Sequence, residues 1–233
     1  MRWIPLAVVI LSLPAPAFAQ DCARFVNTDD GFSANFPGQP KVDVTTYPTE
    51  YGQTLPARIY RAADSLGRYS TTVVDYRGLE KLHADRAAKC RAADGANQQD
   101  GDTCQNDFRL DIAGATDHAV WNYLKRDGVK MTHYMYYFIE LVSGRLLQLT
   151  NPDKSRTFAV IHQHDGRLYI HKATVKPGMP EPILFMQNLG FVNAQGKNVR
   201  YKTFYTEGYG AEWNFPTTPT PPRTERDIIT SQY

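Results

Sequence analysis

Histidines gather where two predicted strands meet. His162, His164 and His171 flank the dipeptide Asp165-Gly166, and Asp-Gly between two β-rich runs is a strong signal of a two-residue hairpin turn. Because side chains alternate along a strand, this turn places the three histidines on one face. Imidazoles two residues apart lie about 6 to 7 Å apart at their bases, close enough to converge on one zinc or copper ion. One hypothesis is therefore a metal site formed by His162, His164 and His171.

The same hairpin has a plainer interpretation. Ile161, Leu168 and Ile170 lie on the opposite face and have the character of core residues, which leaves the histidine face, with Tyr169, as a half-exposed polar surface. Zinc and copper need three or four ligands at short distances, and the nearest acidic residue is Asp165 in the turn itself. A polar outer face is the alternative to a metal site.

Other catalytic and binding motifs are missing from the sequence. It contains no Gly-x-Ser-x-Gly, no His-Glu-x-x-His and no phosphate-cradling glycine loop. The loop between Asp94 and Asp107 is rich in carboxylates, but Cys104 stands where a calcium loop needs a further oxygen ligand. The sequence therefore names no catalytic residue and favours a protein that is not an enzyme.

Alternating and β-branched residues predict the strands that position the histidines. Hairpins are expected from residues 31–36 with 41–47 across the turn at 37–40, and from residues 55–62 with 69–76 across 64–67. Later strands are expected at 130–142, turning at Ser143-Gly144 into 145–150, and at 156–164 with 167–175.

Helices are predicted at residues 79–93, 111–126 and 180–191, from helix-forming composition, helical spacing of apolar residues and stop signals such as Asp127-Gly128. The order of strands, two helices, strands and a helix predicts an α+β domain, in which helices cover an antiparallel sheet. Residues 20–200 form this single domain, and residues 201–233 are an aromatic, proline-rich and extended tail.

Two aromatic segments raise the question of a partner. Residues 132–138 are expected to pack one side in the core while a helix covers the other, and the alternative is an exposed surface for a protein or ligand. The aromatic residues of the tail, from Tyr201 to Phe215, either clamp their own domain or dock on another protein. The aromatic strand and the tail are therefore the two candidate partner surfaces.

The first residues predict that the protein is exported from the cytoplasm. Arg2, a short apolar run and the small residues Ala17 and Ala19 match a cleavable signal peptide at residues 1–19. The run is shorter than the roughly 20 residues that span a bilayer, and no later segment approaches that length. The formal net charge of +2 argues against a dedicated nucleic-acid binder. A periplasmic or secreted protein is expected, with no transmembrane segment after cleavage.

Three cysteines remain after cleavage, in a compartment that favours disulfides. Cys90 and Cys104 bracket a polar loop and are the expected pair, while pairing of Cys22 with either of them stays open. A catalytic role for Cys22 is not favoured, because no activating residue lies beside it.

Two stretches resemble a known family. Residues 31–40 (GFSANFPGQP) and the combination of 167–170 (RLYI) with 180–192 resemble secreted bacterial domains with a PsbP/Mog1-like α/β/α sandwich, especially small signal-peptide proteins of alphaproteobacteria. The resemblance implies a non-catalytic accessory or binding protein, as a subunit of a larger assembly, and carries over no catalytic residue. The alternative function is metal binding through His162, His164 and His171.

Overall fold

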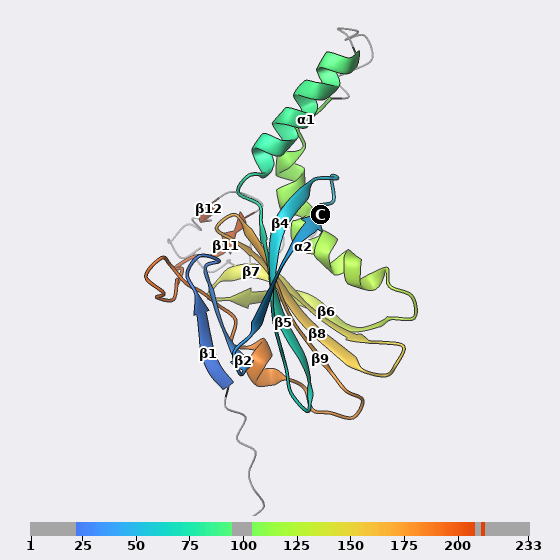
Figure 1. The fold of residues 1–233 in the computed structure, drawn as a ribbon, viewed down its shortest axis with the longest axis vertical. Coiled ribbons are helices and arrows are strands. Elements are labelled where there is room, and N and C mark those ends of the chain that lie inside the picture. The colour runs from blue at the N-terminus through green and yellow to red at the C-terminus, as the bar shows by residue number, and fades with distance from the viewer. Residues whose placement is uncertain (1–21, 95–103, 208–210, 213–233) are drawn as a thin grey trace, which may run out of the picture.

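The computed structural model describes residues 22–94, 104–207 and 211–212, so the expected leader 1–19, most of the acidic loop and the tail beyond Glu212 lie outside the described residues. The described chain is α+β, as the sequence predicts, with a large sheet, a small sheet and helices around them (Figure 1). No helix in the described ranges has the length and apolar character that crossing a membrane requires.

A large sheet forms the centre of the protein. Its strands are β3 (Lys41–Pro48), β4 (Thr54–Ala63), β5 (Gly67–Asp75), β6 (Lys130–Ile139), β7 (Val142–Thr150), β8 (Arg156–His164), β9 (Arg167–Val175), β11 (Tyr205–Thr206) and β12 (Ala211–Glu212). Their order is β12-β11-β7-β8-β9-β5-β4-β3, with β6 also paired to β7. The expected purely antiparallel sheet is a mixed one, because β11 returns from the far end of the chain and runs parallel to β7.

A second, small sheet lies over one face of the large one (Figure 1). It contains β1 (Cys22–Asn27), β2 (Phe32–Pro37) and β10 (Gly190–Phe191), in the order β1-β2-β10. The predicted pairing of residues 31–36 with 41–47 is therefore wrong: β2 pairs with β1, while β3 pairs with β4 in the other sheet. The turn at 37–40 instead carries the chain from the small sheet to the large one.

Helices cover the opposite face only in part. They are α1 (Leu79–Asp94) and α2 (Phe108–Leu124), whereas the single turn α3 (Ile183–Met186) packs with the small sheet on the first face. Helix α2 packs on the large sheet, whereas α1 projects beyond it (Figure 1). The expected helix at 180–191 is largely wrong, because β10 takes up Gly190 and Phe191 in the small sheet.

Two apolar clusters hold the layers together. On one face Tyr60, Val160 and Tyr169 of the large sheet meet Phe32 of β2 and Phe185 of α3. On the other face, Leu147, Ile161 and Leu168 of the large sheet meet one side of α2, where Ala115 and Ala119 are buried. Covered on both sides, β8 and β9 are buried along nearly their whole length.

Local turn chemistry explains where the register was predictable. The hairpin β8–β9 turns at Asp165 and Gly166, both with positive φ (50° and 65°), as a two-residue turn of this kind requires. His162 lies opposite Tyr169, and His164 opposite Arg167, which confirms the predicted register. The β4–β5 hairpin is also confirmed.

The turn between β6 and β7 lies elsewhere than predicted. It falls at Glu140 and Leu141, which adopt positive φ of 48° and 67°, and not at Ser143-Gly144. Gly144 is a glycine for a different reason: a Cβ there would collide with the His162 ring and the Ile161 carbonyl on β8. The close approach of two strands, which the sequence alone does not reveal, explains this glycine.

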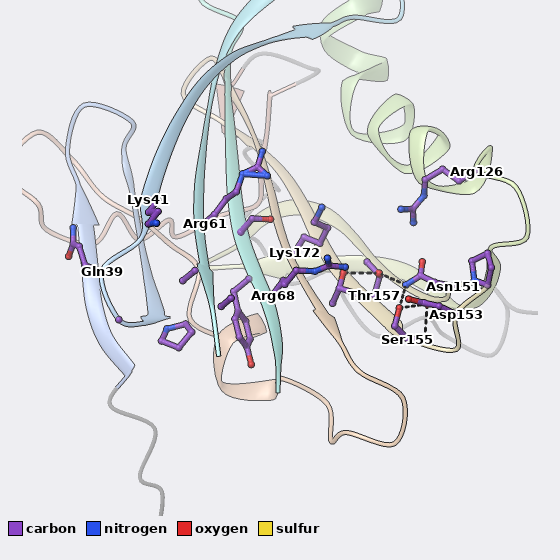
Figure 2. A pocket seen from close by; sticks show the side chains of 18 residues that line it. Gln39, Lys41, Arg61, Arg68, Arg126, Asn151, Asp153, Ser155, Thr157 and Lys172 are labelled. Atoms are coloured by element: carbon purple, nitrogen blue, oxygen red, sulfur yellow. Dashed lines mark hydrogen bonds between the residues drawn. The ribbon is translucent and has the colours of Figure 1, made fainter. Parts of the chain in front are cut away.

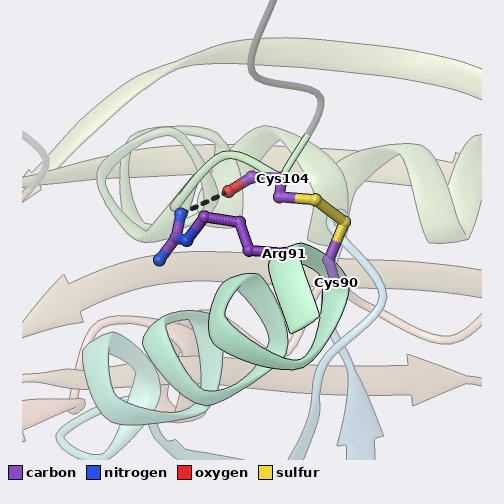
Figure 3. Close-up of a disulfide and its surroundings, with 3 residues drawn as sticks. All are labelled: Cys90, Arg91 and Cys104. Atoms are coloured by element: carbon purple, nitrogen blue, oxygen red, sulfur yellow. Dashed lines mark hydrogen bonds between the residues drawn. A yellow bond between two sulfur atoms is a disulfide. The ribbon is translucent and has the colours of Figure 1, made fainter. Parts of the chain in front are cut away.

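A disulfide joins Cys90 near the end of α1 to Cys104 ahead of α2, as the sequence predicts (Figure 3). Arg91 donates from Nη1 to the Cys104 carbonyl oxygen at 3.1 Å, which adds a second link at the same point. The side chain of Cys22 lies outside the described residues, so its role stays a question from the sequence.

Candidate functional site

The three histidines share one face, as predicted, but that face is buried in the core between the two sheets. His162 and His171 have no exposed surface and His164 has 4%. The rings of His162 and His164 lie against Phe191 of β10, and the ring of His171 stacks on Phe185 at 3.9 Å between centroids. The expected half-exposed polar surface is therefore wrong, because the small sheet and α3 cover it.

Hydrogen bonds hold these imidazoles as structural groups. His171 donates from Nε2 to the Phe185 carbonyl oxygen at 2.9 Å, and its Nδ1 accepts from the Thr71 hydroxyl at 2.8 Å. His164 Nε2 lies 2.8 Å from the Tyr201 hydroxyl, and His162 Nδ1 donates to the Ser143 carbonyl oxygen. Both nitrogens of His171 are engaged, so it offers no lone pair to a metal.

The predicted metal site does not form in the described part of the chain. No three side chains of His, Cys, Asp or Glu come together there in a way that could hold one ion. His162, His164 and His171 are instead core histidines, and their burial lowers the pKa of each to about 4. At neutral pH they are uncharged, which is the form that an apolar interior favours.

A cleft lies elsewhere, on the part of the α2-side face of the large sheet that α2 does not cover. Its volume is about 910 Å³. Figure 2 shows its labelled side chains rising from neighbouring strands and from the loops at 126 and 151–155. Its basic lining residues are Lys41, Arg61, Arg68, Arg126 and Lys172, against the single acidic residue Asp153.

Strand register explains why these cations meet. Lys41 pairs with Arg61, Arg61 with Ser70, and Ser70 with Lys172, so the four residues form one row across β3, β4, β5 and β9. Directly paired residues point to the same face, and at about 4.8 Å per strand the row spans roughly 14 Å. Arg68, two residues before Ser70, lies on the same face.

Lys172 is the central cation of this basic cleft. It is half-buried, its ammonium lies 5.8 Å from the Tyr123 ring centroid, and no ion pair involves it among the described residues. Its pKa lies below the usual value, first because burial removes water and then because Arg126, Arg61 and Arg68 are positive. A half-buried positive charge surrounded by positive charges favours an anion beside it.

The remaining polar groups at this site are mostly occupied. Asp153 accepts from the Ser155 hydroxyl and backbone N–H, which lowers its pKa and commits its charge to its own turn. Asn151 donates to the hydroxyls of Ser155 and Thr157. Arg61 forms an ion pair with Asp43 at 2.7 Å, but both side chains are about half exposed, so the pair is weak.

The chemistry that this lining supports is anion binding. Cations and hydroxyl groups line the cleft, so an anion would meet both positive charge and hydrogen-bond donors there. Sequence reasoning missed the site because its cations come from separate strands. The one signal was Lys and Arg at positions that become neighbours only once the register is known.

The two expected partner surfaces differ in how much of them is exposed. Strand β6 was expected to pack one side in the core and the other under a helix, and this is wrong. Most of its side chains are exposed on both faces, since it lies at an edge of the sheet. The first tail aromatics pack on their own domain: Tyr201 and Tyr205 lie against His164, and Phe204 against Phe138. The aromatic residues from Trp213 onward lie outside the described residues.

Comparison with known proteins finds little. No family model matches the chain, and no curated protein matches it. A solved structure with some likeness is the solution structure of cyanobacterial PsbP (CyanoP) from Synechocystis sp. PCC 6803, at 9% sequence identity and a TM-score of 0.37, covering 71% of this chain and 86% of that chain. With fewer than one residue in ten identical, neither a ligand nor a partner transfers from that protein to this chain.

Proposed function

We propose that this chain is an exported, non-catalytic binding protein whose basic cleft holds a multiply charged anionic ligand. The observation that carries the proposal is Lys172, a half-buried ammonium without an ion pair in the described chain, set among Arg61, Arg68 and Arg126. Other proteins place such a cluster where a phosphate, sulfate or carboxylate group completes the charge balance.

The extent of the row supports a ligand with several charges. Lys41 and Lys172 are three strands apart, roughly 14 Å by strand spacing, which exceeds the reach of one phosphate group. A cleft of about 910 Å³ accommodates a ligand the size of a phosphorylated or acidic sugar. The hydroxyl of Ser70 suits a hydroxyl group on such a ligand, whereas those of Thr157 and Thr174 bond to each other at 3.0 Å.

Binding is expected to strengthen with the charge of the probe. Calorimetric titration of the purified chain with inorganic phosphate, pyrophosphate and inositol hexakisphosphate should give dissociation constants that fall in that order. Substitution Lys172→Ala should weaken binding of the last by about tenfold to a hundredfold, the effect of losing one hydrogen bond to a charged group. Rising salt should weaken binding of the wild type.

Lys176→Ala is the matched control for this experiment. Lys176 directly follows β9, the strand that carries Lys172. It is exposed, lies outside the cleft, and donates to the Ser65 carbonyl oxygen at 2.9 Å. Its loss removes the same charge from the chain and should leave binding unchanged. Equal weakening by both variants, or no binding of any of the three anions, would contradict the proposal.

Export is the second part of the proposal and has its own test. The leader-like residues 1–19 and the disulfide between Cys90 and Cys104 support it, since stable disulfides are typical of oxidising compartments. Protein isolated from its native cells is expected to begin at Gln20, by intact mass, with Cys90 and Cys104 oxidised. A chain that begins at Met1 and keeps both thiols reduced would exclude export.

A further inference from the structure

The outer edge of β6 is a strand edge without a partner in the described structure. Strand β6 pairs with β7 along one side from Lys130 to Ile139, and no described strand pairs with its other side. Its main-chain N–H and C=O groups along that side are therefore available to another extended chain. Because such groups recognise only a main chain in register, the natural occupant of this edge is a polypeptide strand.

Aromatic side chains line the same edge. Tyr134, Tyr136 and Phe138 alternate onto one face, and 69% of Tyr136 is exposed. Arg145 of β7 lies over the Tyr136 ring at 4.3 Å and bonds to Tyr134 and to Asp117 of α2. Tyr and Arg are the residues most enriched where proteins bind one another.

Trp121 extends this surface onto α2. It lies one helical turn from Asp117, on the same side of the helix, with 59% of its surface exposed. A contiguous group of large exposed aromatic residues is unusual on a chain that functions alone.

The opposite edge of the sheet is protected in the usual way, and β6 is not. Strand β3 carries Lys41 and Asp43 and ends at Pro48, and charges and proline at an edge prevent further pairing. The run from Tyr134 to Ile139 contains no charge, proline or glycine. A register shift between Met131 and His133 interrupts only the start of β6.

We infer that a second copy of this chain occupies the β6 edge, antiparallel, with a two-fold axis at Tyr136. This register places Tyr134 of each copy opposite Phe138 of the other, so that aromatic residues meet along one continuous face. The uncharged run produces no like-charge repulsion. Any antiparallel pairing also brings the Lys130 end of one strand to the Glu140 end of the other, which makes the ends complementary in charge.

The pairing is compatible with the proposed binding site. The basic cleft extends from β3 to Arg126 and the loop 151–155, which adjoins the Lys130 end of β6, whereas the proposed two-fold axis lies at Tyr136, nearer the other end of that strand. No residue of β6 lines the cleft, so the pairing uses none of the cleft's residues.

Two variants test the dimer, one by disruption and one by cross-linking. Tyr136→Lys sets two like charges opposite each other and should turn a dimer, measured by sedimentation velocity and light scattering, into a monomer at the same concentration. Tyr136→Cys should form an interchain disulfide under mild oxidation, because paired antiparallel residues have Cα atoms about 4.5 to 5.5 Å apart, within disulfide range.

Val44→Lys and Val44→Cys are the matched controls, because Val44 is 83% exposed on the protected edge strand β3. They should keep the dimer and form no cross-link, even with Cys22 present in every variant. A wild type that stays monomeric up to its solubility limit overturns the inference, whether or not another polypeptide protects the β6 amides from hydrogen exchange. A dimer that Tyr136→Lys leaves intact and Tyr136→Cys does not cross-link overturns it as well.

Discussion

Lowering the pH from 7 to 5 is expected to reduce the free energy of unfolding by about 6 kcal/mol, through three buried histidines. Burial holds the pKa of His162, His164 and His171 at about 4 in the folded chain, first of all because a charged imidazole would lose its water. In the unfolded chain each pKa returns to about 6.5.

The direction of the effect follows from these two values. Above pH 6.5 neither state binds the protons, so the full stability is present. Between pH 6.5 and pH 4 the unfolded chain binds protons that the folded chain does not, and stability falls as the pH falls. At pH 5 each histidine accounts for about 2 kcal/mol, and the sum is comparable to the whole stability of many domains.

Urea unfolding at pH 7, 6 and 5 measures this loss, and two glutamine variants separate its source. His171→Gln retains a donor for the Phe185 carbonyl oxygen but does not titrate, so it should reduce the pH dependence by about a third. His133→Gln removes an exposed histidine of β6 and should leave the dependence as in the wild type. Equal stability at pH 7 and pH 5 in the wild type would show that the three histidines do not control it.

Asp111→Ala is expected to lower the free energy of unfolding by about 3 kcal/mol or more, because it leaves two buried donors unpaired. Asp111 is fully buried on α2. Its Oδ2 accepts from the Thr49 hydroxyl at 2.5 Å and from His83 Nε2 at 3.0 Å. Arg86 Nη2 lies 3.2 Å from the other ring nitrogen of His83, Nδ1.

The position of this carboxylate explains the size of the effect. Helix α1 buries only a narrow stripe, Leu79, His83 and Ala87, one helical turn apart. The bond from His83 to Asp111 joins that stripe to α2, and the bond from Thr49 joins the turn before β4 to the same point. Without Asp111, α1 keeps the disulfide, the surface bonds of Arg86 and Arg91 to Tyr51, Asp107 and Cys104, and a thin apolar contact.

Asp117→Ala provides the matched comparison on the same helix. Asp117 is 54% exposed at its side chain and pairs with Arg145 at the surface, and surface pairs contribute about 1 kcal/mol or less. Both variants remove one aspartate from α2, so chemical denaturation of the two isolates the effect of burial. Similar losses in both would mean that the Asp111 contacts are unimportant to stability.

How much of the fold could be predicted depended on the distance over which each signal acts. The β8–β9 hairpin was predictable because Asp165 and Gly166 specify both the turn and the register within a few residues. The β1–β2 pairing was missed because the pattern at residues 31–47 fits two partners equally well. The choice between them is made by the layer in which each strand is buried.

The candidate site shows the same difference between local signals, which the sequence reveals, and contacts between distant segments, which it does not. The sequence placed His162, His164 and His171 on one face, and they share it, but only packing decided that β10 and α3 cover that face. The cations of the cleft left no local pattern, since Lys41 and Lys172 are 131 positions apart in the chain.

By itself the sequence determined the α+β composition, two hairpins, the extent of α1 and the pair Cys90 with Cys104. Each of these depends on neighbouring residues or on a short loop. The tertiary structure decided which strand edges pair, which faces are covered, and where positive charges meet. Those outcomes depend on contacts between distant segments, and burial, which sets the protonation of a histidine or the partner of a lysine, exists only after the layers have come together.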